Sequence, residues 1–353
     1  MITANKATFC SAAWFNVRNE NNGTLKSCTC IKSDESYNIN NCTIEEWRNS
    51  SSMLRLREEH ANGNKPKSCQ RCWDLEALGL ESQRMQYNRI VNLDWANVYF
   101  NYYPGTYKTH LTIASDLKIG NKCNLECAMC SPEYSSKIAK TWKDKPSLEF
   151  TTVMNSKDYQ NTLLMKFMDE LFEHPIKFVN VLGGEPLLEK RLTNKLLSLK
   201  NKHKINLNFI TNGTFNLKEY SAKLKDFKSL HFAVSVDGIG DVNDYIRKGS
   251  DWATIKNNIL NNDVHLIATV QALNIHHLHE LEDFANNNNI EVQYISVFDP
   301  DYMSLDAVPP EELQRVKTNS KTVQTLINNA NYKPALREKH LRYIKWYTQK
   351  SPN

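Results

Sequence analysis

Short apolar runs alternate with longer amphipathic stretches between about residues 110 and 299. Six runs have the length and composition of β-strands: residues 111–114, 178–182, 207–210, 230–236, 265–270 and 292–297. The stretches between them are long enough for helices: residues 158–173, 187–200, 217–228, 241–260 and 276–286. This alternation is typical of consecutive βα units and predicts an α/β fold around a parallel sheet. Six units are too few for a closed eight-stranded barrel, so we expect a partial (βα)6 barrel.

The two ends of the chain have a different pattern. Residues 1–100 show no βα alternation and hold six of the nine cysteines, so we expect a small, irregular, cysteine-rich domain there. Residues 101–304 would form the barrel. Residues 305–353 read as a helical extension, in which Pro309 and Pro310 suit a helix start and residues 337–350 form a basic, aromatic, amphipathic segment.

Length and composition are ordinary for a globular protein of two modules and do not indicate a membrane protein. The chain has 353 residues, of which 41% are hydrophobic and 24% charged, and a formal net charge of +5. No apolar run approaches the roughly 20 residues of a membrane span, and the first residues lack the apolar core of a signal peptide. We therefore expect a cytoplasmic protein, whose reducing surroundings suit cysteines that bind metal clusters. Lysine and arginine are scattered, so nucleic acid is not indicated as a partner.

Three cysteines, Cys123, Cys127 and Cys130, follow the first expected strand at CxxxCxxC spacing. Three thiolates at this spacing can ligate three irons of a [4Fe–4S] cluster and leave the fourth iron open for chemistry. Taken alone, the spacing also suits part of a zinc knuckle.

Small and polar residues follow the next expected strands, at the sheet edge where α/β proteins bind ligands. They are Gly183, Gly184 and Glu185 after the second strand, Asn212 after the third, and Ser235 and Asp237 at the end of the fourth. Asn-Gly and Asp-Gly are ordinary turn signals when they occur singly. Their order on successive strand ends, behind the cysteine motif, favours a ligand site.

Together these motifs resemble the signature of the radical S-adenosylmethionine (SAM) superfamily. The resemblance implies that the open iron chelates the amino and carboxylate groups of SAM, which an electron splits to a 5′-deoxyadenosyl radical. It also implies that Glu185 and the glycine backbone hold the SAM amino group, while Asn212, Ser235 and Asp237 contact its carboxylate and ribose. Met129 stands where relatives often carry an aromatic residue near the adenine. Arg247 would reach a carboxylate of SAM or substrate, although it reads equally well as a solvated helix arginine.

The amino-terminal cysteines form a second motif. Cys10, Gly23 and Cys28 have CX12GX4C spacing, and a CxxC pair, Cys69 and Cys72, follows. Four thiolates suffice for a second [4Fe–4S] cluster, and they also suit tetrahedral zinc. The segment resembles SPASM and twitch auxiliary-cluster modules, although these usually follow the barrel. The further cysteine pairs that would build a second auxiliary cluster are missing, so we expect a single auxiliary cluster. Cys30 is an alternative ligand to Cys28, and the Gly23 spacing favours Cys28.

The resemblance implies a radical SAM enzyme, oxidoreductase-like, that abstracts hydrogen from a substrate with an auxiliary cluster assisting. A peptide or protein side chain is the first expectation, altered by oxidation, cross-linking or epimerisation. A small-molecule substrate such as a sugar or alcohol is the alternative, and a non-catalytic iron–sulfur protein is the alternative from another class. The expected electron donor is a flavodoxin or ferredoxin.

Overall fold

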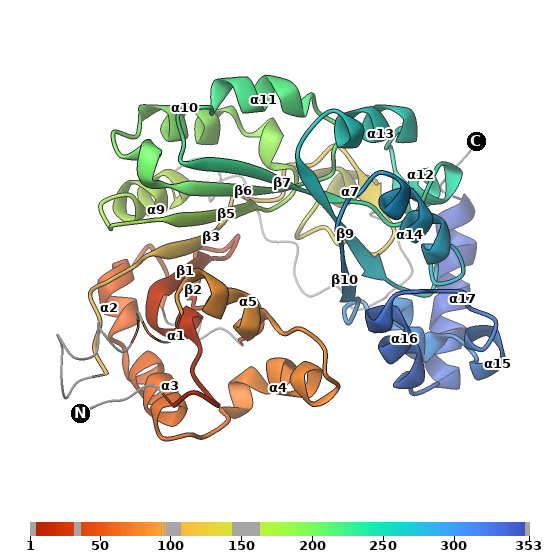
Figure 1. The fold of residues 1–353 in the computed structure, drawn as a ribbon, viewed down its shortest axis with the longest axis horizontal. Helices are drawn as coiled ribbons and strands as arrows, with labels where there is room; N and C mark the ends of the chain where they lie inside the picture. The colour runs from red at the N-terminus through yellow and green to blue at the C-terminus, as the bar shows by residue number, and fades with distance from the viewer. Residues whose placement is uncertain are drawn as a thin grey trace.

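The computed structural model describes residues 5–31, 37–92, 94, 96, 107–142 and 163–349. A sheet with the strand order β10-β9-β7-β6-β5-β3-β1-β2 lies at its centre (Figure 1). The strands are β1 (Asn16–Asn19), β2 (Leu25–Lys26), β3 (Ala114–Lys118), β5 (Phe178–Leu182), β6 (Asn206–Thr211), β7 (Ser229–Ser235), β9 (Val264–Val270) and β10 (Val292–Ser296). Neighbouring strands are parallel except β1 and β2. The predicted α/β fold with a mostly parallel sheet is confirmed.

The first expected strand is displaced along the chain. We expected it at residues 111–114, but β3 begins at Ala114 and ends at Lys118. Ile113 is only a lead-in, whose backbone already bonds to Phe15 on one side and Phe178 on the other. The apolar run therefore marks the approach to the strand, while the strand itself carries polar residues toward the inside of the protein.

Helices follow the strands as the βα pattern predicts. Those after the first strands are α9 (Leu164–Leu171), α10 (Lys190–Ser198) and α11 (Leu217–Lys223), which lie along one face of the sheet (Figure 1). The later ones are α12 (Asp241–Ile246), α13 (Trp252–Leu260) and α14 (Leu278–Asn287). The single helix expected over 241–260 is two helices separated by the short strand β8 (Arg247–Lys248). Residues 158–162 of the helix expected over 158–173 lie outside the described residues.

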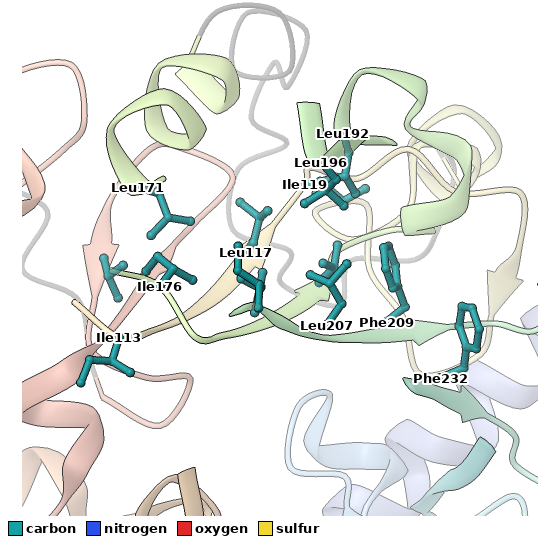
Figure 2. Close-up of a cluster of buried hydrophobic side chains, with 14 of the residues drawn as sticks. Ile113, Leu117, Ile119, Leu171, Ile176, Leu192, Leu196, Leu207, Phe209 and Phe232 are labelled. Atoms are coloured by element: carbon teal, nitrogen blue, oxygen red, sulfur yellow. The ribbon is translucent and has the colours of Figure 1, made fainter. Parts of the chain in front are cut away.

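The main core lies between the sheet and these helices. Strands β5 and β6 bury every second residue on that side, with Leu207 and Phe209 on β6 at 1% and 2% exposure. Leu171 of α9 and Leu196 of α10 point toward these strands (Figure 2). Burying one such side chain stabilises the fold by roughly 1.5–3 kcal/mol. The packing on this face therefore holds the strands in place, and with them the strand ends that carry the predicted site residues.

The other face of the same strands is polar. Asp116, Asn180 and Asn208 are register partners on β3, β5 and β6. Asn180 Nδ2 donates to Asp116 Oδ1 over 3.0 Å, and Asn208 Nδ2 donates to Asn180 Oδ1 over 3.3 Å. Alternating side chains point to opposite faces of a strand, so apolar and polar residues separate cleanly. The polar face leads toward the strand ends where the predicted site residues lie.

The amino-terminal region joins the same sheet through β1, which runs parallel to β3. Its helices are α1 (Ser11–Phe15), α2 (Ile44–Arg48), α3 (Ser51–Ala61), α4 (Gln70–Ala77) and α5 (Gln83–Ile90). Arg48 and Arg57 are buried and donate to the carbonyls of Trp14 and Ala13 over 2.6 and 2.8 Å. Buried cations need such acceptors, so these two arginines fasten α2 and α3 to α1. Sequence analysis did not foresee that this region extends the sheet.

The carboxyl-terminal region is helical, as predicted from its pattern. It comprises α15 (Pro310–Leu313), α16 (Lys321–Asn328) and α17 (Pro334–Gln349), near the end of β10 (Figure 1). Helix α17 buries Leu336, His340, Tyr343 and Tyr347 on one face. Among the described residues, no helix is both long and apolar enough to cross a membrane.

Candidate active site

The cysteines of the CxxxCxxC motif lie on one loop after β3, and all three line a single cavity. Cys127 lies on the short strand β4 (Glu126–Cys127), which pairs antiparallel with β8. In this pairing Cys127 is opposite Arg247. The amide of Ala128 donates to Ile246 O over 2.8 Å, which extends the contact beyond the strand pair. The loop is therefore held from the side of α12 and β8.

The chemistry of this donor set fits an iron–sulfur cluster bound by three thiolates. Burial raises the pKa of Cys130 to about 12, and it also raises the pKa values of Cys123 and Cys127. Arg247 opposes the effect at all three thiols because its positive charge favours the thiolates. A coordinating metal deprotonates such thiols. The site would hold the cluster as thiolates while leaving one iron without a cysteine ligand.

Gly183 and Gly184 pack directly against the start of the cysteine loop. The amide of Gly184 donates to Gly120 O over 2.9 Å, and the amide of Glu185 donates to Lys122 O over 2.8 Å. A Cβ added at Gly184 would lie 2.4 Å from Lys122 O, and one at Gly183 would lie 2.8 Å from Gly120 O. The two glycines allow β5 to approach the backbone that leads into Cys123.

The side chain of Glu185 lies behind the cavity and does not line it. It is fully buried and accepts hydrogen bonds from Leu187 N at 3.0 Å, Thr211 Oγ1 at 2.8 Å and Asn212 N at 2.7 Å. These contacts tie the end of β5 to the end of β6. In this conformation the carboxylate acts as a fastening for the strand ends.

Burial raises the pKa of Glu185 to about 7, and its hydrogen bonds only partly offset this. The folded protein then holds the proton more tightly than the unfolded chain, whose glutamate titrates near 4.3. Its contribution to the free energy of unfolding is present at low pH and falls as the pH rises from about 4.5 to 7. Thermal melting of metal-free wild type and Glu185→Gln checks this. We expect the difference in Tm, wild type minus variant, to decrease over this range, and a constant difference would contradict it.

Asn212 and Ser235, from the ends of β6 and β7, line the cavity. The Asn212 side chain accepts from Thr214 N over 3.0 Å and donates to Asn124 Oδ1 over 2.9 Å. Asn124 lies between Cys123 and Cys127, so the end of β6 also contacts the cysteine loop. Both side chains carry donors and acceptors suited to a polar ligand.

Asp237 is buried behind the cavity wall and forms an ion pair with Arg247, with 2.8 Å between Oδ2 and Nε. Its other oxygen accepts from Thr269 N over 2.8 Å. Arg247 is 7% exposed and lines the cavity. It is thus a buried, paired cation on β8, not a solvated helix arginine.

The cavity has a volume of about 860 Å³, which is ample for a drug-sized ligand. Nine of the predicted residues line it: Cys123, Cys127, Met129, Cys130, Gly183, Gly184, Asn212, Ser235 and Arg247. Residues 117–270, which include all of these, match the family model described as the Radical SAM superfamily. This segment is a radical SAM domain. Such a domain implies a [4Fe–4S] cluster and SAM.

Relatives of this radical SAM domain are found among curated proteins. Uncharacterized protein MJ0907 of Methanocaldococcus jannaschii is 27% identical over 57% of this chain and 64% of its own length. GTP 3',8-cyclase of Helicobacter pylori J99 is 25% identical over 51% of this chain and 54% of its own. The chain thus spans less than two thirds of these relatives. Among solved structures, Streptococcus suis SuiB bound to precursor peptide SuiA has 15% identity and a TM-score of 0.39, covering 96% of this chain and 69% of that chain.

Lys118, at the end of β3, is a cavity residue of the radical SAM domain that sequence analysis missed. Its side chain is fully buried, with Nζ 2.7 Å from Glu20 Oε2, 3.3 Å from Glu133 Oε1 and 4.2 Å from the centre of the Tyr134 ring. Burial lowers its pKa, against the attraction of Glu20. A correct boundary for the first strand would have placed Lys118 at a strand end and revealed it.

The loop after β10 also contributes to the cavity through Phe298 and Asp299. Phe298 is 60% exposed, and the guanidinium carbon of Arg71 lies 3.6 Å from the centre of its ring. Arg71 is on α4, beside Cys72, so this contact connects the amino-terminal region with the rim of the radical SAM cavity. This loop follows a strand end, where ligands are expected to bind, but no sequence motif in it indicated a ligand.

The amino-terminal cysteines converge away from this cavity. Cys10 and Cys28 are buried in one apolar cluster, and Cys30 packs against it. The thiol of Cys30 interacts with those of Cys28 and Cys72, while Cys69 Sγ lies 3.9 Å from His60 Nε2. Burial raises the pKa of Cys10, and the neighbouring Cys28 and Cys69 raise it further. Within the described residues, no group of three or more His, Cys, Asp or Glu side chains is arranged for a single metal ion.

Proposed function

We propose that this protein is a radical SAM enzyme that removes a hydrogen atom from a peptide or protein side chain. The observation that carries the proposal is the convergence of Cys123, Cys127 and Cys130 with the glycine pair and Arg247 on one cavity within the radical SAM domain. When bound, the [4Fe–4S] cluster and SAM supply a 5′-deoxyadenosyl radical for that abstraction.

The side chains around the cavity have separate tasks in this proposal. Cys123, Cys127 and Cys130 would hold three irons of the cluster. Arg247, fixed by Asp237, keeps positive charge beside the thiolates and can receive a carboxylate. Asn212 and Ser235 offer donors and acceptors to the polar groups of SAM, and Met129 offers an adaptable apolar contact. Glu185 acts indirectly, by fixing Asn212 through its backbone amide.

A peptide substrate is supported by the character of the cavity rim. Tyr134 and Phe298 line the cavity and are 40% and 60% exposed. Exposed aromatic side chains beside a deep pocket are typical anchors for a polypeptide partner. The expected outcomes remain oxidation, cross-linking or epimerisation. A small-molecule substrate is the second candidate, favoured by the 25% identity to GTP 3',8-cyclase of Helicobacter pylori.

Formation of 5′-deoxyadenosine tests the proposed function. Anaerobically reconstituted protein is mixed with SAM and dithionite, and the product is quantified by chromatography. A flavodoxin or ferredoxin with its reductase replaces dithionite in a second series to test the proposed electron donors. We expect reductant-dependent 5′-deoxyadenosine in both. None with any donor, from protein that carries its iron, would favour the non-catalytic iron–sulfur alternative.

We further propose that Cys10, Cys28, Cys69 and Cys72 hold an auxiliary [4Fe–4S] cluster in a twitch-like amino-terminal module. The proximity of these thiols supports it, and so does their burial, which protects a cluster from solvent. Cys30, between Cys28 and Cys72, is the alternative ligand. In the enzyme this cluster would accept an electron from the substrate radical.

Replacing both Cys69 and Cys72 with alanine is expected to remove about four irons per chain while sparing SAM cleavage that is uncoupled from substrate. The reason is that these thiols belong to the amino-terminal group and do not line the radical SAM cavity. Iron, sulfide and zinc assays, together with 5′-deoxyadenosine formation, check this.

Cys42→Ala is the matched control, because Cys42 lies apart from the other thiols and contacts Asn38 O. It should retain all iron. Loss of SAM cleavage in the Cys69/Cys72 variant, with the fold intact, would argue that this cluster supplies electrons to the first one. Loss of one zinc in place of iron would make the module structural.

A further inference from the structure

Helix α17, from the carboxyl-terminal region, places two tyrosine hydroxyls on the loop that carries the first cysteine motif. Tyr343 Oη donates to Ala128 O over 2.6 Å, and Tyr347 Oη donates to Glu126 O over 3.1 Å. Ala128 and Glu126 are the two neighbours of Cys127 in the chain. The backbone carbonyls of the residues before and after the central cysteine therefore both accept hydrogen bonds from hydroxyls of one distant helix.

Both contacts are buried and well supported. Tyr343 and Tyr347 are each 1% exposed, and burial raises the pKa values of both phenols, so they remain neutral donors. The single O–H of Tyr347 is shared, because its oxygen also lies 3.0 Å from Tyr245 O and 3.4 Å from Ile246 O, at the end of α12 next to β8. Its bond to Glu126 O is therefore the weaker of the two contacts to the cysteine loop. Since β8 pairs with β4, this one hydroxyl contacts both sides of the strand pair that holds Cys127.

An aromatic cluster fixes the orientation of these rings. Trp142, at the end of α7 (Ser136–Thr141), packs edge-on to Trp346 with 5.2 Å between ring centres. The rings of Tyr343 and Tyr347 are 5.6 Å apart, and Tyr302 packs against Tyr343 at 5.1 Å. The same apolar cluster includes Ala128, Met129 and Cys130. Phenylalanine would satisfy this packing equally well, so the packing alone does not explain the hydroxyls.

We propose that Tyr343 and Tyr347 are positioning residues for the first cluster, through the carbonyl groups on either side of Cys127. This inference rests on the proposed function. Hydrogen bonding and burial around the ligands set the reduction potential of an iron–sulfur cluster. Each tyrosine O–H draws electron density from the carbonyl oxygen of a residue adjacent to Cys127, which would be a cluster ligand. Without the O–H, that oxygen repels added negative charge more strongly, and the cluster becomes harder to reduce.

The test compares wild type with Tyr343→Phe, Tyr347→Phe and the double variant. Tyr294→Phe is the matched control, because Tyr294 is partly buried in a different core and its hydroxyl has no hydrogen-bond partner among the described residues. Each protein carries the Cys69/Cys72→Ala change, so that only the first cluster contributes. The readouts are iron content, the electron paramagnetic resonance spectrum of the reduced cluster with and without SAM, and the midpoint potential.

We expect the phenylalanine variants to retain the wild-type circular dichroism, to show a more negative midpoint potential and to give an altered spectrum with a weaker response to SAM. The double variant should show the largest change and Tyr294→Phe none. Loss of iron from a folded Tyr343→Phe would equally support the proposal. If the double variant does not fold, Tyr343→Phe decides.

Wild-type spectra and potentials in all folded variants would overturn the proposal, and so would unfolding of Tyr343→Phe itself, which would make this hydroxyl a determinant of stability alone. Failure of the proposed function has a different result. In that case the Cys69/Cys72→Ala protein with both tyrosines intact already gives no [4Fe–4S] signal, or one that SAM does not change. The two failures can therefore be distinguished before any tyrosine variant is compared.

Discussion

Replacing Cys123, Cys127 and Cys130 with alanine is expected to abolish 5′-deoxyadenosine formation and to lower the iron content from about eight to about four per chain. The three thiols line one cavity, and residues 119–135 contain no other cysteine. Because the amino-terminal thiols form a separate group, their cluster should remain. Iron, acid-labile sulfide and zinc are measured on the same reconstituted samples.

The loss should come from missing ligands rather than from unfolding. Burial raises the pKa of each of these thiols, so in metal-free protein they are neutral groups that alanine replaces at small cost. The melting temperature of the metal-free variant should therefore stay close to that of metal-free wild type. Residual 5′-deoxyadenosine above the no-enzyme blank would contradict the assignment. A fall from about four irons to none, with one zinc retained, would reassign the amino-terminal site to zinc.

Gly184→Ala is expected to damage the same site without removing any ligand. The new Cβ would lie 2.4 Å from Lys122 O and 2.7 Å from Asn121 C, and both are backbone atoms that cannot rotate away. Relieving this overlap should cost roughly 1–3 kcal/mol of stability and displace the backbone leading into Cys123. Since misplacement by about 1 Å can cost about a hundredfold in rate, we expect 5′-deoxyadenosine formation to fall at least tenfold. Melting curves, iron assays and product formation check these effects.

Gly79→Ala separates this steric effect from backbone strain. Gly79 has φ of +71° but no atom within 4 Å of an added Cβ, so alanine there brings strain without overlap. It should lower stability by roughly 1 kcal/mol and leave the cluster and product formation unchanged. Wild-type cleavage by Gly184→Ala would mean that the cysteine loop tolerates displacement, against the close packing described above.

Much of the sheet was predictable because its strands bury apolar side chains against helices on one face. β5 begins and ends at the residues predicted, and β6, β7, β9 and β10 begin or end within one residue of prediction. The first strand was misplaced because it faces a charged interior. Lys118 and Asp116 break the apolar run that marks the other strands, and Lys118 was overlooked for the same reason.

The sequence identified the motif residues, but it did not show which of their side chains face the cavity. Glu185 and Asp237 lie at strand ends, as Asn212 and Ser235 do. Their carboxylates, however, do not line the cavity and accept hydrogen bonds from backbone amides. Which way a side chain turns depends on donors from neighbouring strands, and these become adjacent only on folding. The same holds for Tyr343, whose partner Ala128 is 215 positions away in the chain.

The pairing of β1 with β3 has a consequence for how such a protein can be rearranged. Asn19 exchanges two hydrogen bonds with the Lys118 backbone, of 2.6 and 2.9 Å, so the amino-terminal region is attached along an edge of the sheet and not only through its linker. Strand pairing of this kind does not depend on whether the amino-terminal region is linked covalently to the start or to the end of the rest of the sheet. A circular permutation that reverses the order of the two parts along the chain should therefore leave both groups of cysteines in place.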